Sequence, residues 1–515
     1  MWEPTLSVVT TTERRDHTAV LVLACAAALA VLVANISGIA TGDDGVGYRA
    51  IADSLVEGGG YGYFLEDPVT IWPPVWPALM ALVARLTPLD TMGAAIALNA
   101  AVAAGVVLSG NHLLRLVLDD RRLVMAGTVV MALGPATIGL GHVLMTDMAF
   151  ALVTLWWMTA LARFRRNGSV VVLLAASLLV WLGFGLRYVG LVLIPTGGLW
   201  LVIGPAKDWL LRLRDAAFYG AVAAVVPISW MMRNHAIDGT FTGERNPSAR
   251  GFIDNCMDAA ATLGRFLLPG LGNGFVKVWA AVGLVVLAAA AVVTWRVLRS
   301  TPGPVMPRLW SFAAQPLGLV LLFAGTYLLY MIYVRTTTAL NQLDTRLLFP
   351  AYLPLVICAL ALLERIGRPG VLIARGWAGA NVAVGLLGMV AFAAGHPYFV
   401  GNYESDVFHD VRANPAVAAL PAGCTLYSNL PNALYPAYES LWSPRRTALE
   451  STRRIDDLER ITATLEATQS CLVWIDEPPT YGHLYTLEQL RELLDLEPVS
   501  SDGVVSTYLM NTRPG

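Results

Sequence analysis

The chain has 515 residues, of which 56% are hydrophobic and only 14% are charged, whereas soluble domains carry roughly 25% charged residues. Apolar stretches long enough to cross the ~30 Å hydrocarbon core of a bilayer recur between residues 19 and 395. A soluble enzyme, a disordered chain and a receptor with one membrane anchor are therefore excluded. The net charge of −2 provides no basic field, so no nucleic-acid partner is expected.

The first apolar stretch follows a short tail, 1–18, that contains Arg14 and Arg15. No small-residue cleavage pattern comes after it, which indicates a retained first span and not a signal peptide. Basic residues gather at alternate ends of the apolar stretches, and the positive-inside rule places those ends, with the N-terminal tail, in the cytoplasm. We predict about eleven transmembrane helices, near 19–39, 92–114, 123–140, 147–163, 170–186, 188–204, 215–232, 275–296, 314–334, 346–364 and 372–394.

These helices are expected to form one α-helical membrane domain over 19–395. With an odd number of spans, the chain after this domain lies outside the cell membrane. Two external loops, 40–91 and 233–274, are too long to be simple connectors. The chemistry is therefore expected on the external face.

The C-terminal segment, 396–515, differs from the rest, with 16 Asp and Glu against 8 Arg and no long apolar stretch. Short apolar runs near 424–429, 471–476 and 504–510 predict strands, and amphipathic stretches between them predict helices. We therefore expect a small extracytoplasmic α/β domain.

Five cysteines show no CxxC or Cys/His spacing of a metal site. Cys424 and Cys471 each open a predicted strand. They either form a disulfide in an oxidising compartment or remain two buried thiols, and the sequence leaves both alternatives open.

Two carboxylates, Asp43 and Asp44, lie just where the first predicted span leaves the membrane. Carboxylates at the hydrocarbon boundary are costly to desolvate, which favours a functional role. Asp44 precedes Tyr48 by four residues, so the two would share one face of a helix. A carboxylate that caps an interfacial helix is the structural alternative.

A pattern extends from these residues along the first external loop. Asp44 and Tyr48 are followed by a glycine-rich turn that ends at Tyr61, and then by Pro73-Pro74 and an apolar segment. This order resembles the first external loop of the GT-C superfamily of polytopic glycosyltransferases, in particular the bacterial branch related to protein O-mannosyltransferases and to the lipid A aminoarabinose transferase. Motifs downstream extend the resemblance to about residue 395: Met145-Thr146-Asp147, Leu186-Arg187-Tyr188 and Thr345-Arg346-Leu347.

The resemblance implies an inverting enzyme that moves a sugar from a polyprenyl-phosphate donor to an acceptor hydroxyl. The acceptor would be a polysaccharide, a glycolipid or a protein on the external face of a bacterial inner membrane. A carboxylate would take the acceptor proton. Relatives usually have Glu after the aligned Asp, where this chain has Gly45, so the base is either Asp44 or Asp43; the spacing to Tyr48 favours Asp44.

The leaving group in such a reaction is a lipid phosphate, whose charge needs fixed cations. Arg346, Arg335 and Arg187 lie at predicted external ends of spans and are the phosphate-binding candidates, because arginine stays protonated and binds phosphate through paired N–H groups. Arginines at such positions also anchor helix ends to lipid headgroups, which is the structural alternative.

The remaining candidates would position the acceptor or the sugar, and they are Asp147, His142, Tyr48, Tyr61, Trp72 and Glu244. No cofactor is required by this scheme and no metal site is assigned, although a divalent cation held by His142, Asp147 and Asp44 is an open alternative. Two competing functions are a transporter or flippase of a lipid-linked saccharide, and a sugar-polymer ligase or polymerase. A transporter would place ionisable residues near the membrane midplane and often shows inverted repeats, whereas here the charges lie at the outer boundary.

Overall fold

The computed structural model describes residues 11–65, 68–204, 208–245, 247–268, 276–300, 305–398, 402–446, 448–450, 453–476 and 484–513. The chain forms two compact units. The helical unit comprises Met1–Ser37, Ala95–Ser229 and Arg245–Tyr398, and the sheet unit comprises Gly38–Ala94, Trp230–Glu244 and Phe399–Gly515. Each unit is thus assembled from segments that are far apart in the sequence.

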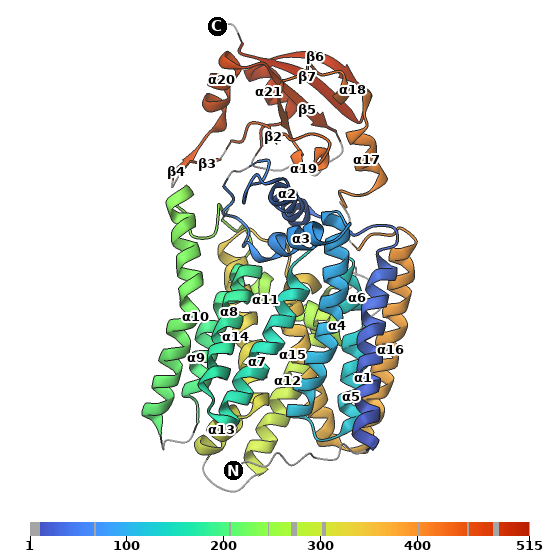
Figure 1. Ribbon diagram of the computed structural model, residues 1–515, viewed down its shortest axis with the longest axis vertical. Helices are drawn as coiled ribbons and strands as arrows, with labels where there is room; N and C mark the ends of the chain where they lie inside the picture. The colour runs from blue at the N-terminus through green and yellow to red at the C-terminus, as the bar shows by residue number, and fades with distance from the viewer. Residues whose placement is uncertain are drawn as a thin grey trace. The chain divides into compact units, whose positions relative to one another are not determined.

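Long helices lying side by side build the helical unit (Figure 1). All or most of each of the following helices belongs to it: α1 (Thr11–Ala34), α4 (Thr91–Val117), α5 (Arg121–Leu133), α6 (Pro135–Gly141), α7 (Asp147–Asn167), α8 (Val170–Leu186), the 3₁₀ helix η1 (Tyr188–Val192), α9 (Leu193–Val202), α10 (Trp209–Asp238), α11 (Phe252–Leu267), α12 (Val276–Ser300), α13 (Val305–Ala313), α14 (Pro316–Thr337), α15 (Thr345–Ile366) and α16 (Arg368–Ala393). Several of their limits follow from local chemistry. Asp344 accepts a hydrogen bond from the backbone N–H of Leu347 and so caps α15, while Pro135 separates α6 from α5.

A helix lies at each of the eleven predicted spans. Within the described residues, seven spans are long and apolar enough to cross a membrane: Asp16–Ala34, Thr91–Val117, Arg121–Gly141, Trp209–Asp238, Pro316–Thr337, Thr345–Ile366 and Arg368–Ala393. The chain is thus a multi-pass membrane protein, and the count of eleven stays a prediction. Residues 1–10 of the expected N-terminal tail lie outside the described residues, and α1 begins already at Thr11.

Aromatic side chains fill the centre of the helical unit. Trp157, Tyr219 and Phe323 are fully buried, and the Trp157 indole N–H donates to the Tyr219 hydroxyl over 2.9 Å. Large apolar side chains such as Leu21 and Leu387 are instead mostly exposed. An exterior of this kind is unfavourable in water and suits contact with lipid chains.

The sheet unit contains one mixed sheet and short helices (Figure 1). Its elements are α2 (Asp43–Glu57), α3 (Val75–Leu86), α17 (Asp406–Arg412), α18 (Pro415–Ala418), β1 (Thr425–Ser428), α19 (Pro431–Leu434), β2 (Leu441–Trp442), β3 (Ala448–Glu450), β4 (Arg453–Ile455), α20 (Asp457–Ala467), β5 (Ser470–Ile475), α21 (Leu487–Leu493), β6 (Asp495–Ser501) and β7 (Val505–Asn511). The strand order is β2-β1-β5-β7-β6, with β1 parallel to β2 and β5, and β7 antiparallel to β5 and β6. Strands β3 and β4 pair separately.

At β5 both faces of this sheet are buried, and successive side chains of the strand point to opposite faces. Leu472 on β5 belongs to an apolar cluster with Ile461 of α20 and Leu490 of α21. Its neighbour Val473 belongs to another cluster, which includes Val46 and Ile51 of α2. The first long loop thus packs with the C-terminal segment, whereas the expected domain limit at 395–396 assigns that loop to the membrane domain.

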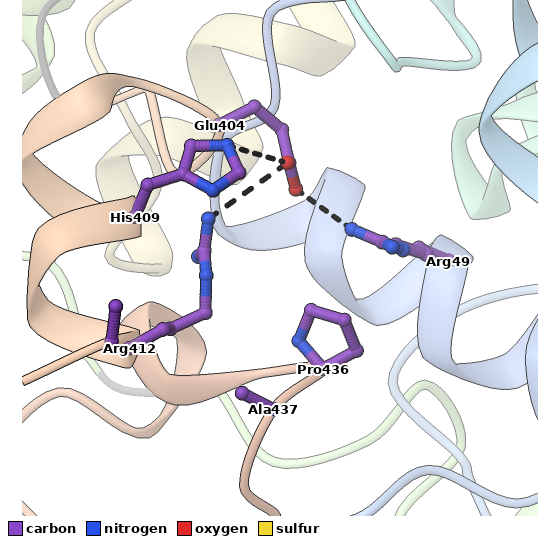
Figure 2. Close-up of a pocket in the computed structure, with 7 residues that line it drawn as sticks. Arg49, Glu404, His409, Arg412, Pro436 and Ala437 are labelled. Carbon is purple, nitrogen blue, oxygen red and sulfur yellow. Dashed lines mark hydrogen bonds and ion pairs between the residues drawn. The ribbon is translucent and has the colours of Figure 1, made fainter.

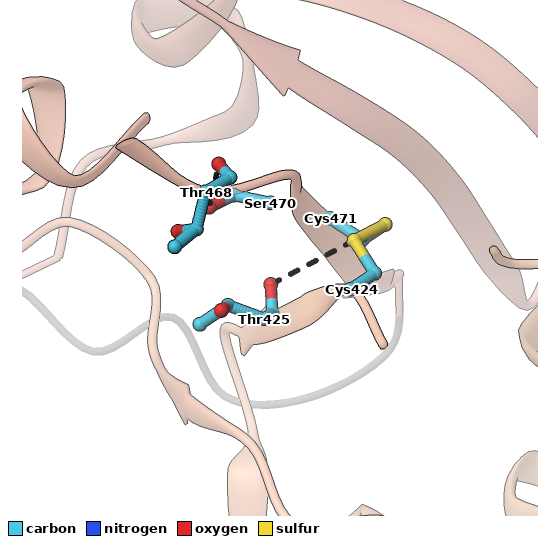
Figure 3. Close-up of a disulfide and its surroundings, with 5 residues drawn as sticks. All are labelled: Cys424, Thr425, Thr468, Ser470 and Cys471. Carbon is cyan, nitrogen blue, oxygen red and sulfur yellow. Dashed lines mark hydrogen bonds between the residues drawn. A yellow bond between two sulfur atoms is a disulfide. The ribbon is translucent and has the colours of Figure 1, made fainter. Parts of the chain in front are cut away.

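A disulfide joins Cys424, just before β1, to Cys471 on β5, with the Cα atoms 6.0 Å apart (Figure 3). Of the two alternatives left by the sequence, the structure therefore has the bonded pair. Because Cys471 lies 47 positions after Cys424, the bond closes a long loop that contains the elements from β1 to α20. Cys25, Cys256 and Cys358 are free.

Candidate functional site

The carboxylates of Asp43 and Asp44 begin helix α2 in the sheet unit. Acidic side chains are favoured there because the helix N-terminus is the positive end of the helix dipole. Oδ1 of Asp43 accepts hydrogen bonds from the Tyr403 hydroxyl at 2.6 Å and from the Asn432 amide at 3.2 Å. Both donors are neutral, so these two contacts with Asp43 are hydrogen bonds and not ion pairs.

Asp44 accepts a hydrogen bond from a different residue, Trp72. Its Oδ1 accepts a hydrogen bond from Nε1 of Trp72 at 3.1 Å. The Trp72 ring also lies 5.9 Å from the ring of Tyr48, between centroids, so one indole contacts both Asp44 and the tyrosine four residues after it. Trp72 thereby fixes the orientation of the Asp44 carboxylate.

The indole of Trp72 is itself tightly held. A Cβ atom on Gly47 would lie 2.3 Å from the indole, so only glycine allows α2 to approach the ring this closely. The ring of Tyr63 packs edge-on against Trp72 with centroids 5.3 Å apart. The hydroxyl of Tyr61 donates to the backbone carbonyl of Trp72 over 2.8 Å. Tyr48, Tyr61 and Trp72 therefore form one aromatic group beside Asp44.

Two further polar groups of the sheet unit are Arg233 and Glu244. Arg233 lies over the rings of Trp230 and Tyr61 and donates to the Val69 carbonyl, so it borders the aromatic group. Glu244, a predicted positioning residue, lies 3.9 Å from the Arg445 guanidinium, which also pairs with Asp457. Glu244 therefore acts in an ion-pair network with the C-terminal segment.

A second polar cluster lies within the helical unit. Asp147, the first residue of α7, is fully buried and forms an ion pair with Arg187 at 2.6 Å. Arg187 follows α8 in extended backbone, and its side chain is 19% exposed. Two predicted site residues from different motifs are thus joined directly.

Arg346 and Tyr398 complete this cluster. Arg346, on α15, is 8% exposed and its Nη1 lies 3.2 Å from Sδ of Met145. Tyr398 forms a hydrogen bond with Thr345 and interacts electrostatically with Asp147 and Arg346. Burial, together with the nearby carboxylates, raises the pKa of Tyr398. The buried cluster is therefore Asp147, Arg187, Arg346 and Tyr398.

The other two predicted residues of the helical unit make different contacts. Arg335 donates to the Ser248 hydroxyl over 3.3 Å, and it interacts electrostatically with Arg250 and Asp258. His142 contacts Asn35 through Nδ1 at 3.2 Å and stacks on Phe392. Within the part of the chain that the structure describes, no group of three or more His, Cys, Asp or Glu side chains is placed to hold a metal ion.

Three residues of these clusters were missed by the sequence reasoning: Tyr398, Tyr403 and Asn432. Tyr403 and Asn432 lie 360 and 389 residues after Asp43. No local pattern marks them, because their role comes only from the tertiary packing of α2 against the C-terminal segment.

Solved structures provide the comparison with known proteins, because neither family models nor curated protein sequences give a match. ArnT from Cupriavidus metallidurans in the apo state aligns with a TM-score of 0.59 and 15% identity, covering 96% of this chain and 98% of that one. ArnT of the same organism bound to undecaprenyl phosphate gives a TM-score of 0.58, 14% identity, and coverage of 95% and 97%.

A third solved structure has a more distantly similar fold. The oligosaccharyltransferase of Archaeoglobus fulgidus, in complex with Zn and sulfate, aligns with a TM-score of 0.50 and 12% identity over 95% of this chain and 72% of that one. ArnT and the archaeal enzyme are both GT-C glycosyltransferases. The chain described here therefore has the fold of the GT-C superfamily of polytopic glycosyltransferases.

Proposed function

We propose that the chain is an inverting glycosyltransferase that moves a sugar from a polyprenyl-phosphate donor to a hydroxyl of a cell-envelope acceptor. The observation that carries the proposal is the fold shared with ArnT over nearly the whole of both chains. A structure of ArnT holds undecaprenyl phosphate, which supports a lipid-phosphate donor here.

In the sheet unit, Asp44 is the proposed general base. Its carboxylate takes the proton of the acceptor hydroxyl as that oxygen attacks the anomeric carbon. Trp72 holds the carboxylate in one orientation through the 3.1 Å hydrogen bond. Asp43, which is held by Tyr403 and Asn432, is the alternative base.

In the helical unit, Arg187 and Arg346 are the proposed ligands of the donor phosphate. As the anomeric carbon–oxygen bond breaks, its electron pair stays on the lipid phosphate, and guanidinium groups stabilise that charge. The carboxylate of Asp147 orients Arg187, because the two form an ion pair at 2.6 Å. Arg335 is a further candidate, and no step is assigned to a metal ion or cofactor.

The orientation in the membrane is proposed from two observations. Disulfides persist in oxidising compartments, so the Cys424–Cys471 bond supports an extracytoplasmic location for the C-terminal segment. The basic residues at alternate helix ends support a cytoplasmic N-terminus. The transfer is accordingly placed on the external face of a bacterial inner membrane.

A transfer assay tests the proposal. The full chain in lipid nanodiscs is incubated with radiolabelled polyprenyl-phosphate sugars and envelope extract, and the label is followed. We expect label to pass from one donor to one acceptor, and Asp44→Asn to abolish this transfer while Asp495→Asn, an exposed carboxylate of β6, does not. Donor binding with no transfer to any acceptor, together with donor movement across the bilayer, would instead indicate a transporter of a lipid-linked saccharide.

A further inference from the structure

A cavity of about 400 Å³ lies in the sheet unit and has no role in the mechanism above (Figure 2). Its charged or polar lining consists of Arg49 on α2, Glu404 in the loop before α17, and His409 and Arg412 on α17. Pro436 and Ala437 contribute apolar walls. The volume is within the range of ordinary small-molecule sites, roughly 300–1,000 Å³.

Arg412 lines this cavity and has a buried donor that makes no hydrogen bond in the described part of the chain. Its side chain is 7% exposed. Nη1 donates to the carbonyls of Tyr403, Ala433 and Tyr435 at 2.9, 3.2 and 3.4 Å, which fixes the guanidinium. Nη2 makes no hydrogen bond within the described residues, and its distance of 3.9 Å from Oε2 of Glu404 is too long for one.

Arg49 is also incompletely paired. Its Nη1 donates to Oε1 of Glu404 at 2.8 Å, but its buried Nε makes no hydrogen bond in the described part of the chain. Asp53 lies 3.6 Å from that Nε. The Asp53 carboxylate is already used by the Tyr435 hydroxyl, at 2.6 Å, and by Thr91.

Among the described residues that line the cavity, Glu404 is the single carboxylate, and it interacts with three cationic or protonatable groups. It bonds closely to Arg49 and lies 3.9 Å from both Arg412 and His409. Burial lowers the pKa of Arg412; Glu404 opposes this shift, and the positive charge of Arg49 adds to it. The two guanidinium groups thus repel each other, and a second anion would relieve that repulsion.

We infer that this cavity binds an acidic group, a carboxylate or a phosphate, carried by the acceptor saccharide. Guanidinium N–H groups bind both kinds of anion through paired hydrogen bonds, and Arg49, Arg412 and the imidazole of His409, which line the cavity, supply such donors. Assigning the anion to the acceptor rests on the proposed function, whereas binding itself requires no transfer. The cavity would select acidic acceptors over neutral ones.

Binding to the full chain in nanodiscs tests the inference, with calorimetry as the measurement. The probes are glucuronate, glucose 1-phosphate and glucose, which share the sugar ring and differ in charge. We expect one or both acidic sugars to bind and glucose not to bind. Binding of glucuronate alone identifies a carboxylate as the ligand, and binding of glucose 1-phosphate alone identifies a phosphate.

Variants locate the binding. Arg49→Gln is expected to weaken it at least about tenfold, since a hydrogen bond to a charged group is lost, and Glu404→Gln to strengthen it, because the competing carboxylate is removed. Arg446→Gln, an exposed arginine of the same unit outside the cavity, is the matched control and should change nothing. Arg49 is used because loss of Arg412 would also leave three carbonyls unpaired.

The inference is overturned if glucose binds as well as the acidic sugars, if Arg49→Gln binds like the control, or if Glu404→Gln weakens binding. The last result would show that Glu404 only braces the two arginines. Asp44→Asn, which should lose transfer, is expected to retain anion binding. A failure of the proposed function and a failure of this inference are therefore distinguishable.

Discussion

The indole N–H of Trp72 donates a hydrogen bond to the Asp44 carboxylate over 3.1 Å, and a Cβ atom on Gly47 would lie 2.3 Å from the same indole. Helix α2 therefore carries both Asp44 and the glycine that leaves room for the indole bound to Asp44. Trp72 acts on the proposed reaction through Asp44, as a positioning residue. Two substitutions separate its hydrogen bond from its packing.

Trp72→Phe keeps an aromatic ring and removes the N–H donor. We expect kcat to fall roughly tenfold, equivalent to about 1.4 kcal/mol, with little change in donor affinity, because Asp44 loses its fixed orientation. Steady-state kinetics with separate measurement of donor binding checks this. An unchanged kcat, or a loss confined to donor affinity, would contradict the positioning role.

Gly47→Ala is expected to displace the same indole, because the new Cβ atom would overlap with it. An alanine for glycine within a helix normally stabilises it by about 0.5–1 kcal/mol, but here the new Cβ meets the Trp72 ring, so we expect lower thermal stability and lower activity. Gly220→Ala on α10 is the control, since its Cβ would meet no atom within 4 Å. Equal melting temperatures for the two variants would show that the indole is not packed as described.

The ion pair between Asp147 and Arg187 predicts strong coupling in a double-mutant cycle. Asp147 is fully buried, so either Asp147→Asn or Arg187→Gln leaves one charge without its partner and should destabilise the chain by about 3 kcal/mol. The double variant should recover much of this loss, because neither charge of the pair remains to be left without the other. The free energy of unfolding in detergent measures the coupling. Additive losses would mean that the two side chains act independently.

The Cys424–Cys471 bond predicts a pattern of thiol labelling. In chain isolated without reductant, these two cysteines should resist alkylation until they are reduced, whereas the free Cys256 should react on unfolding alone. Replacing both bonded cysteines by serine should lower stability by up to about 4 kcal/mol, the entropy of a loop this long. Alkylation of Cys424 or Cys471 in unreduced, unfolded chain would contradict the bond.

Asp502 gives a prediction for acid stability. Backbone N–H groups of Val505 and Val504, and the Asn414 amide, lower the pKa of Asp502 to about 2 from 3.8. A carboxylate whose pKa is lower in the folded chain stabilises it above the unfolded value, and this stability is lost as pH falls from about 4 towards 2.

Asp502→Asn should therefore show a smaller loss of thermal stability across that window than the unsubstituted chain. Asp495→Asn, an exposed aspartate on β6, serves as the control. If the acid dependence of Asp502→Asn matched that of the unsubstituted chain, the hydrogen bonds to Asp502 would carry no pH-dependent stability.

The helices and strands follow closely from local sequence patterns. The uninterrupted apolar run 170–186 gives α8, and the run near 471–476 gives β5. The pairings could not be derived in this way. Asp147 and Arg187 are both predicted site residues, yet nothing in their spacing indicates that they touch. The donors to Asp43 come from residues 360 and 389 positions later. Such contacts depend on tertiary packing, which local periodicity does not record.

The most direct test of Asp44 as the general base compares sugar transfer by the unsubstituted chain with that by Asp44→Asn, at donor concentrations that saturate both. We expect equal donor binding and a loss of transfer of about 10²-fold or more in Asp44→Asn, the usual contribution of a general base. Full transfer activity in Asp44→Asn would contradict the assignment of Asp44 and leave Asp43 as the base to examine.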